Sequence, residues 1–595
     1  MATDIVTHTT GKEQALNSEN VTREIDQEHK QHLVNDLKQT KKTKSALEII
    51  CEFKVAAQSK ISELKNAALL AGFTEADESV QSILYMSPDE FSATYQQSSL
   101  IDLQNKLKTI LEELSRAEEL EIVIHSMNRN ERGDAELFLY IHKGKYVFDS
   151  THGKNGEFYV WNGVHWQLDL DKQRYRDMED VSKKYEWAAS QISDPKLQDI
   201  NSDENLKKEL VKRAKELRSA RRCANVFVFV ASHTPFKSEW DYCPGLLPCL
   251  NGIIDLKNGN LIPHNPGLYI RNICSTNYIK NAQRPLFEQF LDDIMLGNEE
   301  MKGFIKRVKG SAIYGVPKEE KIFYLYGEKG RNGKGTLEQT LEKILGSIAK
   351  TFPSEMLLRQ SNPPSSSNAS PELANLQGVR FAIFSEINKG RKIDASKVKN
   401  LSGRDSISCR RLFSNVDLNI TPTHTMFIQT NYKPEAPSDD DGLWKRNILI
   451  PFNAEFVEDP KLPHQRKLDP EFKDKLISEK EGILAWLVEG CLEYQEHGLN
   501  IPGIVKEETE NYRKENDGIA VFLEERCVID SAFSTPGEKM RKSIKTFCEE
   551  NGFTIPSERD IKDYLEKIFQ RQKTNKGIVW KGVSIPQEQC TEVNR

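Results

Sequence analysis

The chain has 595 residues, several times the usual domain size, with 38% hydrophobic and 29% charged residues, which predicts several folded units with a charged surface. The longest apolar stretches, such as 226–230, fall far short of the roughly 20 residues that a membrane span needs. The net charge of −6 excludes nucleic-acid binding through overall basicity, so any such site must be a local basic patch.

The amino-terminal residues (MATDIVTHTT) are polar and show neither a basic n-region nor an apolar h-region, so no secretion signal is expected. Ten cysteines are scattered between Cys51 and Cys590 without a CxxC pair, which predicts reduced and mostly buried thiols. These features predict a cytoplasmic protein, of a bacterial host cell or an infected cell, with no membrane contact.

The first half of the chain alternates between helical and strand-like patterns. Residues 15 to 120 carry apolar side chains at three- and four-residue spacing, which predicts helices. Short strands are then predicted at 136–140, 145–149 and 157–161. Helical patterns from 171 to about 222 precede a strand-and-turn segment with turns at 251–252 and 258–260, and a helical stretch over 286–314.

The second half contains the most informative region. Between about 320 and 455, strands and helices alternate as in an α/β nucleotide-binding domain. The chain is then helical again. Near the end, helices predicted at 538–551 and 557–569 precede a basic hairpin with its turn at Lys576-Gly577, the outline of a winged helix.

A glycine-rich loop is the strongest local motif. The apolar strand 321–326 enters the loop 327–336, and a helical pattern follows over 337–345, which is the order of a phosphate-binding P-loop. Backbone N–H groups at the helix start would bind the phosphates of ATP, and Lys334 would neutralise their charge. The predicted nucleotide-binding residues are Gly327, Gly330, Arg331, Asn332, Gly333, Lys334, Gly335 and Thr336.

The loop departs from the plain G-x-x-x-x-G-K-[ST] pattern in two ways. Gly327 lies one residue too early, and Gly335 stands where a Ser or Thr hydroxyl normally reaches Mg²⁺. Thr336 is the nearest substitute for that metal ligand. An ordinary glycine-rich turn is the competing interpretation of the loop.

Three polar residues lie beside apolar strands in the order of a nucleotide-hydrolysing motor. Glu386 ends the strand-like run 378–386 and would activate the attacking water or hold the metal, although Ser385 replaces the second acid of many ATPases. Asn431 ends the run 427–431 and could orient the water. Arg446 precedes the strand 448–452 and could reach a neighbouring subunit's nucleotide, with a surface ion pair as the competing interpretation.

As an ordered set these motifs resemble the superfamily 3 helicases, and more narrowly the phage, plasmid and poxvirus primase–helicase group. The segments that carry the resemblance are NGKGT (332–336), GVRFAIFSE (378–386), KNLSGRDSISCRRLF (399–413), FIQTN (427–431) and GLWKRNILIPF (442–452). Weaker similarity extends it over about 130 to 585.

The resemblance implies a multidomain α/β fold. The expected parts are a helical partner-binding or assembly region (1–125), a small α+β module (126–270), a P-loop, AAA+-like ATPase domain (271–475), and a helical segment with a winged helix (476–595).

The resemblance also implies an ATP-dependent DNA helicase that replicates a phage, plasmid or other mobile element as a homo-hexameric ring on single-stranded DNA, with 3′ to 5′ polarity. Lys334, Thr336 and Glu386 would act in cis, with Mg²⁺ held by Thr336 and Glu386. Asn431 would act as sensor and Arg446 in trans. The expected DNA contacts are Lys399, Arg404, Arg410 and Arg411, with His424 a weaker candidate. A solvent-facing or inter-subunit ion pair is the competing interpretation for each of them.

Two functions stay open at the ends of the chain. The acidic signature of a primase has its one match at Leu168–Asp171, where a loop is the simpler interpretation, so we expect no priming activity and a primase or initiator as partner of the first 125 residues. The terminal winged helix could bind origin duplex DNA or a protein. The alternatives to a helicase are an origin-binding initiator that uses ATP as an assembly switch, and a ring ATPase in defence or remodelling.

Overall fold

The computed structural model describes residues 97–192, 204–360, 370–414, 416–553, 555–575 and 577–586. They form two compact units, one combining the residues up to Lys143 with Leu170–Thr234, the other combining Gly144–Asp169 with the chain from Pro235 on. The α+β module predicted over 126–270 is therefore divided between two units. The helices predicted before residue 97 lie outside the described residues. Among the described helices, none is both long and apolar enough for a bilayer crossing.

The described part of the first unit is helical. Its helices are α5 (Gln97–Asn128), α6 (Asn130–Ile141), α7 (Gln173–Gln191), α8 (Glu204–Glu216) and α9 (Ala220–His233). A fully buried carboxylate, Asp134 on α6, ties four of them together. It accepts hydrogen bonds from Tyr185 on α7 (2.8 Å), Arg213 on α8 (3.0 Å) and Arg222 on α9 (2.8 Å), so the buried charge is fully paired.

The strand predicted at 136–140 is wrong, because these residues lie in α6. A short apolar run has no periodicity of its own, and here it buries one side, with Phe138 inside and Tyr140 51% exposed. Within the described residues, the helical pattern predicted from 171 to about 222 is confirmed as α7 and α8 and continues through α9, while 193–203 lie outside the described residues.

Two small antiparallel sheets open the second unit. The first has β1 (Tyr146–Asp149), β2 (Glu157–Trp161) and β3 (Trp166–Leu168) in that order, and the second has β4 (Leu246–Cys249), β5 (Gly252–Asp255) and β6 (Asn260–Ile262). The strands predicted at 145–149 and 157–161 are confirmed, and so are the turns at 251–252 and 258–260.

The centre of the second unit is a five-stranded sheet in which every pairing is parallel. Its strands are β7 (Ile322–Tyr326), β8 (Ala349–Phe352), β9 (Phe381–Phe384), β12 (Thr425–Thr430) and β13 (Asn447–Pro451). Their order across the sheet, β13-β7-β12-β9-β8, places β7 in the interior with β12 and then β9 beside it. The predicted alternation of strands and helices over 320–455 is confirmed.

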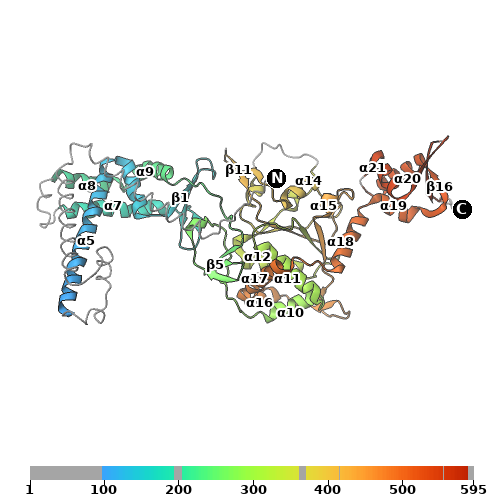
Figure 1. Cartoon of the computed structure of the whole chain (residues 1–595), viewed down its shortest axis with the longest axis horizontal. Helices are drawn as coiled ribbons and strands as arrows, with labels where there is room; N and C mark the ends of the chain where they lie inside the picture. Colours follow the sequence, from blue (N-terminus) through green and yellow to red (C-terminus); the bar gives the residue numbers. More distant parts are fainter. Residues whose placement is uncertain are drawn as a thin grey trace, which may run out of the picture. The chain divides into compact units, whose positions relative to one another are not determined.

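Helices cover both faces of this sheet (Figure 1). The helices of the second unit up to residue 515 are α10 (Pro285–Ile294), α11 (Glu299–Ile313), α12 (Lys334–Leu345), α13 (Pro371–Ala374), α14 (Ala395–Ser402), α15 (Asp441–Trp444), α16 (Phe472–Ile477), α17 (Lys480–His497) and α18 (Gly503–Glu515), with 3-10 turns η2 (Pro266–Leu268), η3 (Gly346–Ile348) and η4 (Ser354–Met356).

Alternation along each strand explains the layers, since successive side chains of a strand point to opposite faces. Phe323 and Leu325 of β7 pack with α10, α11, α12 and α17 in one apolar core. Ile322 and Tyr324 pack with α14 and α18 in the other. Since both faces are covered, the strands read as continuous apolar runs.

Two pairs of short strands and a C-terminal part complete the unit. The strands β10 (Ile407–Arg410) and β11 (Asp417–Ile420) form an antiparallel hairpin, and β14 (Glu455–Val457) pairs with β15 (Gln465–Lys467). The C-terminal part consists, in chain order, of α19 (Gly518–Arg526), β16 (Val528–Pro536), α20 (Gly537–Glu550), α21 (Glu558–Ile568), β17 (Gln570–Thr574) and β18 (Gly577–Ser584).

This C-terminal part has its own apolar core and a sheet of order β16-β18-β17. The predicted helices at 538–551 and 557–569 correspond to α20 and α21, and the predicted hairpin corresponds to β17 and β18. A capping box between Ser557 and Asp560 begins α21.

Candidate functional site

A polar pocket of about 370 Å³ lies at the carboxyl ends of the central strands. Because β7, β12 and β9 are neighbours in a parallel sheet, the residues that follow them meet at one edge. The loop after β7, Glu386 after β9 and Asn431 after β12 all line this pocket, together with one side of α12.

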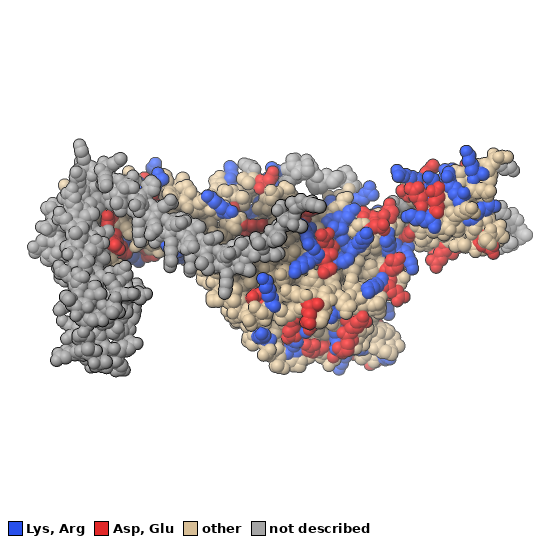
Figure 2. Space-filling model, viewed as in Figure 1, with Lys and Arg blue, Asp and Glu red and all other residues tan. Residues whose placement is uncertain are grey.

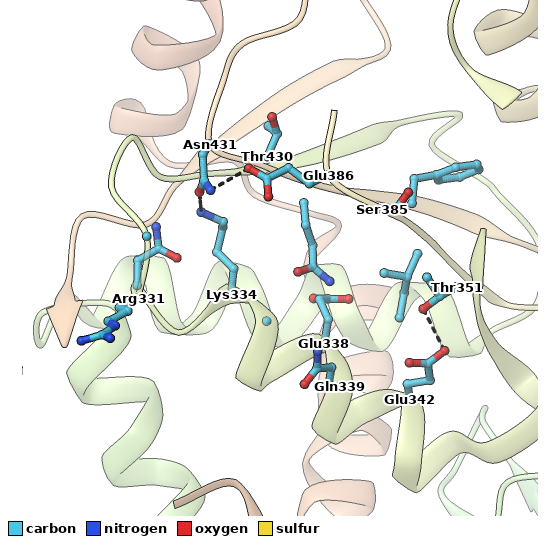
Figure 3. A pocket seen from close by; sticks show the side chains of 16 residues that line it. Arg331, Lys334, Glu338, Gln339, Glu342, Thr351, Ser385, Glu386, Thr430 and Asn431 are labelled. Atoms are coloured by element: carbon cyan, nitrogen blue, oxygen red, sulfur yellow. Dashed lines mark hydrogen bonds between the residues drawn. The ribbon is translucent and has the colours of Figure 1, made fainter. Parts of the chain in front are cut away.

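Three of the four predicted catalytic residues form a hydrogen-bonded chain in the pocket (Figure 3). The ammonium Nζ of Lys334 donates to Oδ1 of Asn431 at 2.8 Å and to the carbonyl of Gly327 at 3.2 Å. The amide Nδ2 of Asn431 donates in turn to Oε1 of Glu386 at 2.6 Å. A cation, an amide and a carboxylate are thus held within reach of one another at the start of a helix.

Burial governs the charge of the central lysine. Lys334 is only 5% exposed, and burial lowers its pKa to about 8, while the charge of Glu386 acts in the opposite direction. An anion placed beside Lys334 would compensate this desolvation. The geometry therefore favours a ligand that brings negative charge to the helix start.

The loop itself uses close packing as well as glycine. Gly333, the N-cap of α12, has φ +83°, and a Cβ there would lie 2.3 Å from Ile294. A Cβ on Gly327 would lie 2.0 Å from the amide of Asn332, which donates to the Lys329 carbonyl at 2.6 Å. Arg331 itself takes the left-handed conformation, with φ +57°, and points away from Lys334 and Asn431.

The two predicted metal ligands are placed differently. Glu386 lines the pocket and is exposed there, whereas Thr336 is absent from the lining residues and Gly335 is present among them. Ser385 also lines the pocket, and its hydroxyl accepts a hydrogen bond from the backbone N–H of Ser354 at 3.0 Å. The hard oxygen donors that face the pocket therefore come mainly from carboxylates and side-chain amides.

The fourth predicted catalytic residue lies at the other end of the sheet. The carbonyl of Arg446 accepts from the N–H of Ile322, the first residue of β7, so Arg446 is at the amino-terminal edge of the strands. Its guanidinium pairs with Glu320 at 2.6 Å. A five-residue strand spans roughly 16 Å, so Arg446 does not reach the pocket of its own chain.

The predicted DNA contacts mostly have partners within the protein. Lys399 pairs with Asp440 at 2.7 Å, and Arg404 lies 3.6 Å from Glu320. Arg410 ends β10 and is half-buried. On the face shown in Figure 2, basic and acidic side chains are interspersed over the described surface. The ion-pair interpretation thus describes Lys399 and Arg404 in this conformation.

Two residues of this region differ from expectation. The Arg411 side chain is only 13% exposed, lies 3.7 Å from the buried Asp149, and donates to Gln377 at 2.6 Å. His424 is 2% exposed, and its Nε2 lies 2.9 Å from the Leu401 carbonyl. Both side chains are buried and bond within the protein. The prediction that His424 contacts DNA is therefore wrong, since His424 is a core residue.

Sequence reasoning missed the acidic side of the pocket and the tip of the hairpin. Glu338 and Glu342 line the pocket from α12, and their helical spacing from Lys334 could have indicated this. Phe413, between β10 and β11, is 77% exposed with φ +62°. An aromatic residue two positions after a pair of arginines was the available signal in the sequence.

Comparison with known families finds two matches in this chain. The family described as "D5 N terminal like" matches residues 135–296, and a family of unknown function matches residues 325–446. The second match contains Lys334, Glu386, Asn431 and Arg446. These positions thus belong to one shared sequence block.

Curated viral proteins are also similar to this chain. A protein named as a candidate helicase of Acanthamoeba polyphaga mimivirus is 27% identical over 72% of this chain and 47% of its own length. The primase D5 of fowlpox virus is 26% identical over 39% of this chain and 30% of its own length. The chain thus spans less than half the length of these relatives.

Among solved structures, the apo C-terminal region of NrS-1 aligns over 76% of this chain and 99% of its own, with 10% identity and a TM-score of 0.40.

Proposed function

We propose that this chain, which is similar to viral primase–helicases of the poxvirus type, is an ATP-driven motor that unwinds DNA during replication of a mobile element or virus. The observation that carries this proposal is the Lys334–Asn431–Glu386 chain at the end of three adjacent parallel strands. It places the charges that phosphoryl transfer needs around a single pocket.

Each residue of this chain has a chemical role in the proposed hydrolysis. Lys334 exchanges its contacts with Gly327 and Asn431 for the β- and γ-phosphates of ATP. Asn431, freed from Lys334, orients the attacking water, and Glu386 accepts its proton. Mg²⁺, when bound with the nucleotide, neutralises phosphate charge, and the carboxylate and amide oxygens of the pocket are suitable donors for it.

The position of Arg446 supports the proposed assembly into a ring. Since Arg446 lies at the opposite edge of the sheet from its own pocket, it can complete a site only on another subunit. Such a head-to-tail interface closes into a ring when its rotation allows, and a hexamer is our proposal. The ion pair with Glu320 must then open when the interface forms.

The hairpin β10–β11 is the proposed contact with single-stranded DNA. Its tip carries Leu412 and Phe413, which are 54% and 77% exposed, next to Arg410. An exposed aromatic ring can stack on a base while basic residues neutralise phosphates, a mode of binding that tolerates any sequence.

The C-terminal part is proposed to be a winged helix. Its element order, helix-strand-helix-helix-strand-strand, and its sheet order β16-β18-β17 support this assignment. Contact with origin duplex DNA is a further proposal. On α21, Arg559 and Lys562 lie within 4 Å of Asp563 and Glu566, so the hairpin β17–β18 is the better candidate for phosphate contacts.

Unwinding of forked DNA, together with DNA-stimulated ATP hydrolysis, tests the proposed function. We expect Lys334→Ala to lower both activities about 100-fold or more, as loss of a preorganised charge at a reacting phosphate does. Lys329→Ala is the matched control, because this loop lysine has a side chain that is 69% exposed and pairs weakly with Glu455 at 3.8 Å.

Hydrolysis without unwinding would point to the initiator or remodelling role. Equal activity of wild type and Lys334→Ala would overturn the assignment of the site.

A further inference from the structure

Glu338 is a fully buried carboxylate that lines the proposed nucleotide pocket. It lies on α12, three residues after Gly335 and four after Lys334, so all three residues share one side of the helix. Figure 3 shows its carboxylate rising from the helix into the pocket, below Glu386 and Asn431. Along α12 it is the first acidic residue that lines the pocket.

Only one of the two oxygens of Glu338 has a partner. The Nζ of Lys309, on α11, donates to Oε1. Lys309 is itself fully buried, lies 3.5 Å from the ring centroid of Phe427, and has a pKa lowered by burial. Oε2 has no hydrogen-bond partner among the described residues. A buried carboxylate oxygen without a partner destabilises the folded chain, and a ligand that binds it would remove this cost.

Two positions that often provide metal ligands in such sites carry different residues here. Gly335 has no side chain where a hydroxyl is usual, and a Cβ built there would meet Gln429 only at 3.7 Å. The hydroxyl of Ser385 already accepts from the Ser354 backbone. Glu338 offers a carboxylate oxygen from the same helix, three residues after Gly335.

We propose that Oε2 of Glu338 is a ligand of the divalent cation that enters with the nucleotide, directly or through a water of its coordination shell. Carboxylate oxygens are hard ligands that suit Mg²⁺, which keeps several waters in such sites. Lys309 acts as a positioning residue, since it holds Oε1 and leaves Oε2 without a hydrogen-bond partner among the described residues. The inference rests on the proposed function, because it assumes that a nucleotide and a cation bind here.

Nucleotide affinity with and without Mg²⁺ tests this inference without using catalysis. A fluorescent ATP analogue is titrated onto the full chain in EDTA and in Mg²⁺. For Glu338→Gln we expect the gain in affinity produced by Mg²⁺ to shrink about tenfold or more. In EDTA we expect unchanged or tighter binding, because a negative charge near the phosphates has been removed.

A matched comparison is Glu342→Gln, one turn further along the same side of α12, where the carboxylate accepts from the Thr351 hydroxyl at 2.9 Å. It should keep most of the Mg²⁺ gain. An equal loss in both variants would overturn the inference in favour of general pocket charge. Weaker binding of Glu338→Gln in both EDTA and Mg²⁺ would assign Glu338 a purely structural role and overturn it as well.

Two further variants keep the inference testable if Glu338→Gln alone misfolds. Lys309→Met with Glu338→Gln removes both buried charges together, a change that folded proteins usually tolerate. It should show the same loss of the Mg²⁺ gain. Gly335→Ser restores the usual hydroxyl, and added to Glu338→Gln it should recover part of the gain; no recovery would count against a shared metal position.

Failure of the proposed function is recognised separately. If wild type binds no nucleotide, or Lys334→Ala binds it as well as wild type, the pocket is misassigned. If wild type binds and Lys334→Ala does not, but Glu338→Gln keeps the full Mg²⁺ gain, only the role of Glu338 is wrong.

Discussion

The Lys334 ammonium is hydrogen-bonded to neutral partners only. Its ammonium contacts a carbonyl and an amide oxygen, and neither compensates the charge as a phosphate would. Burial therefore lowers its pKa to about 8. A residue in this state gains more from an arriving anion than an exposed lysine does, because desolvation has already occurred.

This state predicts a pH-dependent affinity for nucleotide. Below about pH 8 Lys334 is charged, and affinity in EDTA should be nearly constant. Above about pH 8 the free protein must take up a proton on binding, so affinity should fall by up to tenfold per pH unit. A titration with a fluorescent ATP analogue between pH 7 and pH 9.5 measures this slope.

Lys334→Arg is the control for that titration. Arginine stays charged over the whole range, so this variant should lose the slope even if its overall affinity is lower. A slope that persists in Lys334→Arg would show that another group titrates.

At the scale of single elements, the ends of adjacent strands explain why the site could be predicted. Glu386 and Asn431 are polar residues that follow apolar strands within two residues, and parallel strands bring such ends together. Glu338 was missed because its burial depends on Lys309 of another helix, which no local pattern reveals.

Long-range pairing also limited the prediction of DNA contacts. Lys399, Arg404 and Arg411 have carboxylate partners between 41 and 262 positions away in the chain (for example 440 − 399 = 41 and 411 − 149 = 262). A basic run in sequence does not show which of its charges are already paired. Similarly, four apolar residues in α6 looked like a strand because their partners on other helices were not visible.

His424 gives a prediction for the stability of β12, which begins at the next residue. Burial lowers its pKa to about 4, so the unfolded chain binds a proton more readily than the folded one between about pH 6.5 and 4. The stabilisation that neutral, buried His424 contributes is therefore present at pH 7 and is lost as the pH falls towards 4. The loss attributable to His424 between pH 7 and pH 5 should be about 2 kcal/mol.

Hydrogen exchange of a peptide that covers β12, measured at both pH values and corrected for intrinsic rates, reports this change. His424→Gln should lose most of the pH dependence. His497→Gln, whose imidazole is 58% exposed, should keep it. Equal pH dependence in wild type and His424→Gln would contradict the assignment.

At the scale of the whole molecule, the sheet has a complete pocket at one edge and a paired arginine at the other. Glu320 holds both Arg446 (2.6 Å) and Arg404 (3.6 Å) at that second edge. A contact between the two edges of neighbouring subunits would bring the arginine to a nucleotide and make hydrolysis depend on assembly. The rate of ATP hydrolysis should then rise more steeply than linearly with protein concentration.

Mixing two inactive variants tests this dependence directly. Arg446→Ala subunits keep an intact pocket, and Lys334→Ala subunits keep an intact arginine. In an equal mixture about one interface in four pairs the intact pocket with the intact arginine, so ATP hydrolysis should recover to roughly that fraction of wild type. Lys445→Ala, an exposed neighbour of Arg446, should be nearly as active as wild type. Mixed rings that form, as shown by mass, but stay inactive would show that Arg446 does not act on a neighbouring subunit.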